Sequence, residues 1–340
     1  MKCPNCGHNH SAREGRACSK CHYRFVFGKT DGITDNRVML LIKRLGEDGR
    51  YYLTRTQLAL GLAQLRSQYG PLYAVVPFAL GAVVAFTIGG LFIDSTPLLG
   101  VFGALVGFMA VSVGSRALLI KLFPNRPASY RQARQLLERY HRAHPIDKLA
   151  IGGAFAHPGP GTRMEPGYAP ERMLVVERED LADALLSNGF HLEQRCVVVT
   201  VDGYPPHVFK ACQEFVKRHS ELPIYLLHDA SAQGFRALER LETRPEWQFA
   251  RGRVRDLGIT REQLRQSSRQ TLPWLIKGGE TVVHSSDHEK MLKAHGWVPV
   301  DYAPPPALQG ALAAGLVAGM LSLPDPAAAV DGGGGADGAG

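Results

Sequence analysis

Four of the six cysteines lie within the first 21 residues, as two Cys-x-x-Cys pairs that are separated by eleven residues. Thiolates at this spacing converge on one tetrahedral cation and leave no open coordination position for chemistry. So short a segment cannot bury a core of its own without a bound metal. The pattern therefore predicts a structural zinc ribbon over 1–27. The predicted ligands are Cys3, Cys6, Cys18 and Cys21.

Three carboxylates follow three short apolar runs in the second half of the chain. Glu177, Asp202 and Asp229 come at or near the ends of the runs 173–176, 196–201 and 224–227, which alternate with helical patterns. This alternation predicts a Rossmann-like α/β domain with a parallel sheet, whose strand ends share one edge. The three acids could bind magnesium there together with phosphate oxygens. The spacing also allows a local interpretation, in which they occupy a turn, a helix cap and a solvated position.

The segments around these acids carry further motifs. They read Leu174-Val175-Val176-Glu177, then Asp202-Gly203-Tyr204-Pro205, then a run from His228 to Gly234. On these residues the region 173–300 resembles the Toprim domain found in the A-subunit of topoisomerase VI and in its meiotic double-strand-break relatives. The resemblance implies strand-end acids that bind magnesium. The matching positions are Glu177, Gly203, Tyr204, Pro205, Asp229 and Gly234.

The chain departs from the family pattern at two expected acids, where it has Pro206 and Ser231. No tyrosine stands in a preceding domain like the one that carries the family's nucleophile, so we expect no DNA cleavage by transesterification. The favoured function is a membrane-anchored, degenerate Toprim-like module, non-catalytic or weakly metal-dependent, that binds nucleic acid, nucleotide or protein with help from the zinc ribbon. A magnesium-dependent phosphotransferase or nuclease using Glu177, Asp202 and Asp229 stays open. So does a membrane scaffold for protein partners.

Basic residues give the chain a formal net charge of +8. An arginine-rich stretch over 251–269 could contact phosphates. Because Asp256 and Glu262 are interspersed with the arginines, the stretch also fits an ordinary solvated surface.

Two uncharged runs lie in the first half of the chain, at 72–93 and at 98–115. The second continues past Arg116 to Ile120. The lengths predict a transmembrane hairpin over 71–123, with helices at 72–93 and 98–120. Basic residues flank the hairpin and are missing from its turn, which predicts both termini in the cytoplasm, an inner-membrane localisation and the lipid bilayer as a partner.

The expected fold class is a multidomain protein with a zinc ribbon, a two-helix transmembrane hairpin and a cytosolic Toprim-like α/β domain. A short helical module is predicted over 28–70, and it fits packing better than a DNA-reading helix-turn-helix. The remaining segments are a basic juxtamembrane helix within 124–150, a Gly/Pro-rich linker over 151–171, the Toprim-like domain over 172–303, an apolar helix over 304–323 and a disordered tail over 324–340.

Overall fold

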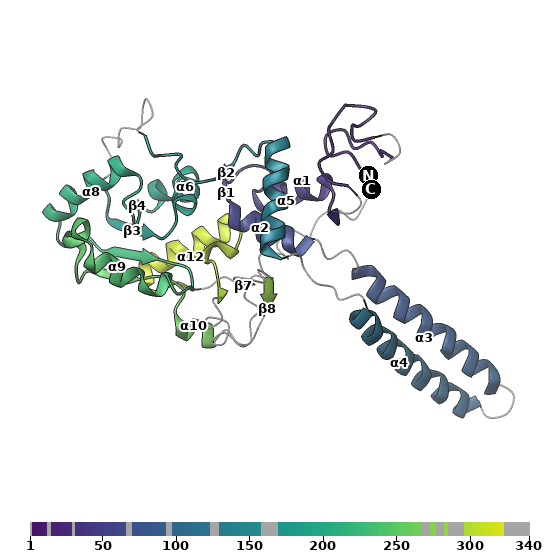
Figure 1. Cartoon of the computed structure of the whole chain (residues 1–340). Coiled ribbons are helices and arrows are strands. Elements are labelled where there is room, and N and C mark those ends of the chain that lie inside the picture. The colour runs from purple at the N-terminus through teal and green to yellow at the C-terminus, as the bar shows by residue number, and fades with distance from the viewer. Residues whose placement is uncertain are drawn as a thin grey trace. The chain divides into compact units, whose positions relative to one another are not determined.

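The computed structural model describes residues 2–11, 15–28, 31–65, 70–92, 97–122, 129–157, 169–266, 273–276, 282–284 and 296–322. Contacts divide the chain into two compact units, one formed by 1–63 with 129–340 and the other by 64–128. Figure 1 labels the elements of both units.

A four-stranded parallel sheet forms the centre of the larger unit. Its strands are β3 (Arg172–Val176), β4 (Cys196–Thr200), β5 (Ile224–Leu227) and β6 (Val254–Asp256), in the order β4-β3-β5-β6. Val176 is in register with both Thr200 and Leu227, so the carboxyl ends of three strands are level with one another. The predicted parallel α/β sheet is thus confirmed.

Helices cover both faces of this sheet (Figure 1). Leu174 and Val176 of β3 pack with apolar residues of α6 and α12, whereas Met173 and Val175 pack with those of α8 and α9. This alternation follows from the two-residue period of a strand, which sends successive side chains to opposite faces. The helices are α6 (Glu179–Ser187), α7 (Phe190–Glu193), α8 (Pro206–Arg218), α9 (Ala237–Thr243), α10 (Arg261–Gln266) and α12 (Pro305–Ala318).

A smaller antiparallel sheet follows in the chain, with the strand order β8-β7-β9. Its strands are β7 (Pro273–Ile276), β8 (Val282–His284) and β9 (Gly296–Trp297). A bridge between Ala230 and Val298 joins the segment after β9 to the segment after β5. This bridge brings the C-terminal part of the chain to the edge where the parallel strands end.

The N-terminal elements of the larger unit are α1 (Asp35–Leu45), β1 (Leu53–Thr54) and α2 (Arg55–Leu65), and α5 (Tyr130–Ala143) and β2 (Leu149–Ala150) follow later. β1 and β2 form a short parallel pair. Leu58 and Leu62 of α2 are fully buried. This burial favours packing over DNA reading for α2, because a recognition helix must present a face to the groove.

The smaller unit consists of two helices, α3 (Gly70–Phe92) and α4 (Pro97–Leu122). They pack closely at Gly81, where a Cβ atom would come within 2.1 Å of Ser112 Oγ. Phe78 and Phe108 make an edge-to-face contact across the pair. Large apolar side chains such as Phe86 are exposed on this unit.

No helix in the described part of the chain has both the length and the apolar composition that crossing a membrane requires. The prediction used only the absence of charged residues from two runs of sequence, which is a weaker criterion than the length and apolar composition of a helix taken together. The finding contradicts the transmembrane hairpin over 72–93 and 98–120 and the inner-membrane localisation with cytoplasmic termini. It gives no support to the lipid bilayer as a partner or to the membrane scaffold.

Some predicted segments lie outside the described residues. These are most of the Gly/Pro-rich linker (158–168), the tail over 324–340 and the end of the arginine-rich stretch, including Arg269.

Candidate functional site

Two of the three predicted acids meet at the carboxyl edge of the parallel sheet. Glu177 directly follows β3, and its Oε2 accepts a hydrogen bond of 3.1 Å from the backbone N–H of Asp229. Asp229 comes two residues after β5 and is 5% exposed. The structure therefore brings Glu177 and Asp229 together because their strands are neighbours.

Arg178 lies among carboxylates at this edge and pairs with three of them. Its guanidinium nitrogens lie 2.6 Å from Asp301, 3.2 Å from Asp180 and 3.4 Å from Asp229. Arg178 also donates a 3.2 Å hydrogen bond to the hydroxyl of Thr56. Arg178 thus pairs with its near neighbour Asp180 and with two acids, Asp229 and Asp301, that are distant in the sequence.

Asp301 is fully buried and was not among the residues predicted from the sequence. It follows the bridge between Ala230 and Val298 and accepts a hydrogen bond from the hydroxyl of Thr54. Its neighbour Val300 donates its N–H to Asp229 Oδ1 at 2.8 Å. The only local signal is an acid between apolar Val300 and aromatic Tyr302, and that signal does not identify its partner.

Asp202, the third predicted acid, pairs with arginines of the helical region after β5. Its Oδ1 lies 2.7 Å from Arg244 and 3.5 Å from Arg240, and its side chain is 58% exposed. Within the described residues, no metal-binding group joins it to Glu177 or Asp229. Asp202 is therefore paired with arginines and does not join Glu177 and Asp229 in a common site.

A further pair is formed by His228, which directly follows β5, and Asp256, the last residue of β6. His228 is 2% exposed, its Nδ1 lies 2.8 Å from the carbonyl oxygen of Asp229 and its Nε2 lies 3.1 Å from Asp256. Both ring nitrogens face oxygen acceptors, which favours the doubly protonated imidazolium. Although burial opposes the charge, Asp256 and the Asp229 carbonyl raise the pKa of His228.

These contacts shift the pKa values of the buried cluster. Burial raises the pKa of the Asp229 carboxyl to about 7, with Arg178 acting in the opposite direction. Burial also raises the pKa of Asp180. Burial opposes the charge of Arg178, but Asp229, Asp301 and Asp180 together raise its pKa well above the ordinary value. Arg178 is therefore a permanent cation in a buried acidic cluster.

The motif residues around the acids have structural roles. Tyr204 is buried, and its hydroxyl donates to Asp183 and accepts the N–H of Phe155. Gly203 has a φ of +79°, and a Cβ there would come within 2.9 Å of a neighbouring aromatic ring. A Cβ on Gly234 would lie 2.0 Å from the carbonyl oxygen of Asp229. The glycines of the motif thus allow the chain to pass close to the site.

The donor set at this edge does not fit a resident magnesium ion. Magnesium needs carboxylate oxygens that are free to complete a near-octahedral shell. Asp229 uses one oxygen for the Val300 N–H and the other for Arg178, while Asp202 pairs with two arginines. A guanidinium beside the same carboxylates would also repel a divalent cation.

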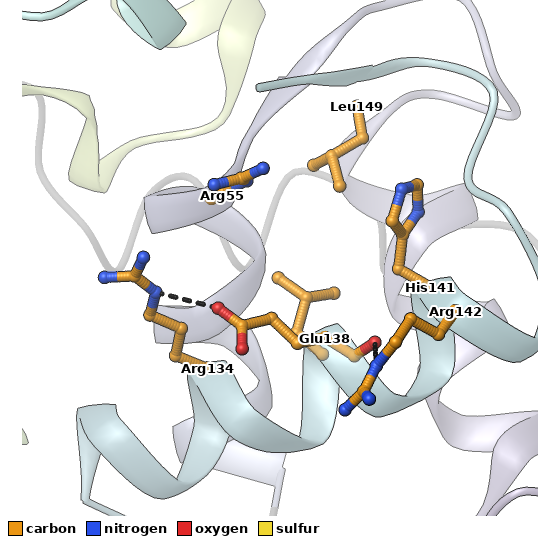
Figure 2. A pocket seen from close by; sticks show the side chains of 7 residues that line it. Arg55, Arg134, Glu138, His141, Arg142 and Leu149 are labelled. Atoms are coloured by element: carbon orange, nitrogen blue, oxygen red, sulfur yellow. Dashed lines mark hydrogen bonds and ion pairs between the residues drawn. The ribbon is translucent and has the colours of Figure 1, made fainter. Parts of the chain in front are cut away.

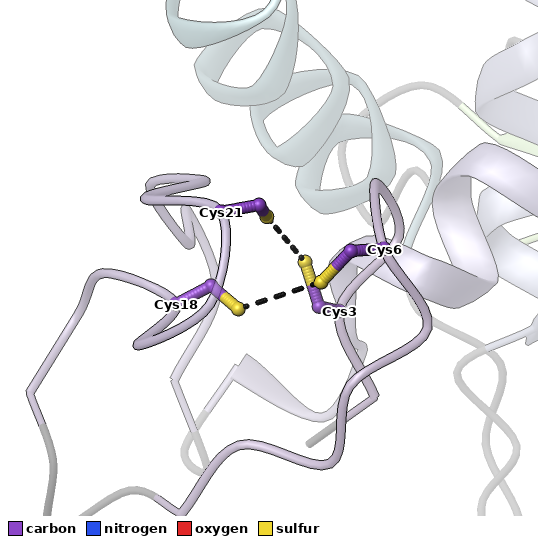
Figure 3. Close-up of side chains that lie close together, drawn as sticks. All are labelled: Cys3, Cys6, Cys18 and Cys21. Carbon is purple, nitrogen blue, oxygen red and sulfur yellow. Dashed lines mark hydrogen bonds between the residues drawn. The ribbon is translucent and has the colours of Figure 1, made fainter.

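The second candidate site is the cluster of four cysteines (Figure 3). Their ligand atoms all lie within 4.8 Å of one another, and they form the only such group of metal-binding side chains among the described residues. The sulfur atoms of Cys3 and Cys21 are 3.5 Å apart, and those of Cys6 and Cys18 are 3.7 Å apart. Zinc–sulfur bonds of about 2.3 Å in a tetrahedron place sulfur atoms about 3.8 Å apart, so the cluster fits zinc.

Both cysteine pairs sit in the same type of backbone turn. The backbone carbonyl oxygen of Cys3 accepts a hydrogen bond from the N–H of Gly7, and that of Cys18 accepts one from the N–H of His22, each at 2.9 Å. Gly7 and His22 have left-handed φ values of +69° and +58°. His10 is 2% exposed and stacks on Phe25 beside these turns.

Comparison with protein families matches residues 172–243 to the Toprim domain of Spo11 and of the A-subunit of topoisomerase 6. Neither the curated proteins nor the solved structures gave a match. The matched segment contains β3, β4, β5 and the helices between them. Toprim domains are typically metal-dependent and act on nucleic acids. The α/β domain of this chain is therefore similar to the Toprim domain that Spo11 shares with topoisomerase 6.

Proposed function

We propose that this chain is a nucleic-acid-binding protein whose Toprim-like domain works without a catalytic magnesium ion. The observation that carries the proposal is the position of Arg178 between Asp180, Asp229 and Asp301. The guanidinium supplies the positive charge that these acids would otherwise draw from a metal. The sheet edge then serves to bind and position a partner rather than to activate phosphate chemistry.

The pairing of the other strand-end acids supports the same proposal. Asp202 is held by Arg240 and Arg244, and Asp256 is held by His228. Glu177 accepts a backbone N–H. A phosphotransferase of this type would need several carboxylates free to share one or two metal ions.

Nucleic acid is the favoured partner because of the family match and the excess of basic residues. Within the arginine-rich stretch, Arg253 donates to backbone carbonyls of Leu222 and Phe249, and Arg261 lies over the Phe235 ring. Arg251 and Arg255 are exposed. We expect Arg251 and Arg255 to contact phosphates, because Arg253 and Arg261 already make the contacts within the fold described above.

The cysteine cluster is proposed to hold one structural zinc ion with Cys3, Cys6, Cys18 and Cys21 as ligands. Its sulfur spacing supports this assignment. Four protein ligands leave no open position, so such a zinc ion would hold the ribbon together and take no part in catalysis.

The test is to measure oligonucleotide binding and cleavage by the full chain with its zinc bound, in buffer that contains magnesium and in buffer from which magnesium has been removed before the protein is added. We expect binding that weakens with salt, no cleavage in either condition, and no loss of binding without magnesium. Arg251→Gln with Arg255→Gln should weaken binding at every sequence tested. Magnesium-dependent cleavage that is lost in Glu177→Ala and Asp229→Ala would instead establish the enzymatic alternative.

A further inference from the structure

A small pocket lies between α5, the start of α2 and β2, with a volume of about 260 Å³. Figure 2 shows Arg55 and Arg134 at one end of this pocket and His141 at the other. Arg142 also lines it, and the single acid among the lining residues is Glu138. The pocket therefore combines three arginines with one carboxylate.

The negative charge of Glu138 is already matched within the pocket. Its Oε1 lies 3.2 Å from Nε of Arg134, and both side chains are about half exposed (49% and 52%). Arg142 donates its Nε–H to the backbone carbonyl of Glu138 at 3.3 Å. Arg134 reaches Glu138 through its Nε alone, so its Nη groups can still donate to a ligand. Three arginines against one carboxylate leave two positive charges in excess, which favour an anionic ligand.

Arg55 is the pocket arginine with the fewest partners in the chain, although its charge acts on Asp180 and there opposes the rise of that acid's pKa. Among the described residues, none forms a hydrogen bond or ion pair with its guanidinium. It is the first residue of α2, where the helix dipole adds a partial positive charge. Its position is fixed by the preceding Thr54, which pairs with Ala150 in the β1–β2 ladder and exchanges hydrogen bonds with Gln57.

His141 adds a neutral donor. Its Nδ1 lies 3.0 Å from the backbone N–H of Ile146, and it must accept this hydrogen bond. The ring proton of a neutral imidazole then resides on Nε2, which is left to donate to a ligand oxygen. Leu137, which is buried, and Leu149 supply apolar surface beside these donors.

We propose that this pocket binds one backbone phosphate of a nucleic-acid strand, an inference that rests on the proposed function. The planar forks of Arg55 and Arg134 suit phosphate oxygens, and the volume is slightly below the roughly 300 Å³ at which pockets for larger ligands begin. The pocket is also next to the sheet edge, since Thr56 follows Arg55 and accepts from Arg178. A strand bound at that edge can therefore place a phosphate in the pocket.

The test uses the full chain, a fluorescein-labelled oligonucleotide and, separately, AMP and inorganic phosphate. Arg55→Gln and Arg134→Gln are each expected to weaken oligonucleotide binding and to lower the slope of log affinity against log salt by about 1. The matched control is Arg131→Gln, an exposed arginine of the same helix that does not line the pocket. It should leave both the affinity and the slope unchanged.

The outcomes separate this inference from the proposed function. Wild-type binding that neither pocket variant changes overturns the pocket and leaves the proposed function standing. Binding of AMP or inorganic phosphate that depends on Arg55 and Arg134, without oligonucleotide binding, refutes the proposed function and assigns the pocket to a free phosphate ligand. Loss of affinity in Arg131→Gln equal to that in the pocket variants overturns the pocket as a distinct site. A wild type that binds none of the three probes overturns both proposals.

Discussion

Arg178 decides the charge balance of the sheet edge, because Asp229 and Asp301 are almost completely buried and both pair with it. A buried carboxylate without a partner is strongly unfavourable. If Arg178 takes the place of a metal ion, a variant without this arginine should bind a metal ion between the acids that Arg178 now pairs with. The wild-type protein should show no such response.

Arg178→Ala is expected to lower the free energy of unfolding by about 3 to 5 kcal/mol, since it leaves buried acids unpaired. Millimolar magnesium or calcium should restore part of the melting temperature of this variant and leave that of the wild type unchanged. Differential scanning fluorimetry with and without the ion provides the measurement. Equal stabilisation of wild type and variant would contradict the substitution of a metal by Arg178.

The control for this prediction is Arg240→Ala. Arg240 pairs with Asp202 at the same edge, but both side chains are substantially exposed, at 38% and 58%. Exposed ion pairs contribute at most about 1 kcal/mol. Arg240→Ala should therefore lower the free energy of unfolding only slightly, and added magnesium or calcium should not change the melting temperature of this variant.

The raised pKa of Asp229 leads us to expect that the free energy of unfolding depends on pH. Burial raises its pKa in the folded protein to about 7, against about 3.9 in an unfolded chain. The folded state then holds a proton that the unfolded state releases, so this stabilisation is complete below about pH 4 and is lost as the pH rises to about 7. The slope reaches up to about 1.4 kcal/mol per pH unit.

The measurement compares urea unfolding of the wild type and Asp229→Asn across this range. Asparagine can still accept the Val300 N–H but does not titrate. The wild type should lose stability relative to the variant as the pH rises. If the difference in free energy of unfolding between wild type and variant stays constant, or changes in the other direction, Asp229 is ionised at every pH in this range.

At the level of residues, the sequence predicts those features that depend on short spacing. The two Cys-x-x-Cys pairs and the meeting of Glu177 with Asp229 follow from local motifs and from strand order. The role of Arg178 does not, because two of its partners lie 51 and 123 residues further along the chain, at Asp229 and Asp301. Nothing near Asp301 in the sequence indicates that it reaches this edge.

Among the elements, α12 shows how an apolar helix is used within a fold. The sequence predicts an apolar helix over 304–323, and the structure packs Leu308, Leu312 and Leu316 of α12 into the core on one face of the sheet. Tyr225 of β5 donates its hydroxyl to the carbonyl of Leu316 at 2.9 Å. The helix therefore completes the domain that begins more than a hundred residues earlier.

Two substitutions in α12 test this role. Leu312 is fully buried, so Leu312→Ala is expected to lower the free energy of unfolding by about 2 to 5 kcal/mol. Val317 on the same helix is 81% exposed, and Val317→Ala should change the free energy of unfolding by less than about 0.5 kcal/mol. Chemical denaturation of both variants measures the difference. Similar losses in the two would contradict the observed packing.

The strands β3, β4 and β5 were predictable because each carries a continuous apolar run, and their ends agree with those runs within one residue. The fourth strand, β6, was not predicted, because the charged residues Arg255 and Asp256 interrupt its apolar pattern. β1 and β2 were not, since each has two residues and they pair across 96 residues of chain. Such a pairing depends on tertiary contacts that no local pattern records. The pocket beside them was missed for the same reason, although its arginines are plain in the sequence.

For the whole molecule, the question is how the cysteine ribbon affects the rest of the larger unit. Asp35 of α1 is 1% exposed and accepts the backbone N–H groups of Val26 and Phe27, at 2.9 and 3.1 Å. Tyr23 stacks on His144, at the end of α5, with ring centroids 4.3 Å apart. The ribbon is thus joined to the helix that lines the proposed phosphate pocket.

Removal of zinc should therefore affect α5 as well as the ribbon. We expect one zinc per chain by elemental analysis, and its loss in Cys18→Ser but not in Cys212→Ala, since Cys212 lies in the core of the sheet domain. After chelation, hydrogen exchange should rise in 15–28 and at the end of α5, while β3 and β4 stay protected, because the sheet has its own core. Equal loss of protection in the sheet would show that the ribbon and the sheet domain unfold as one cooperative unit.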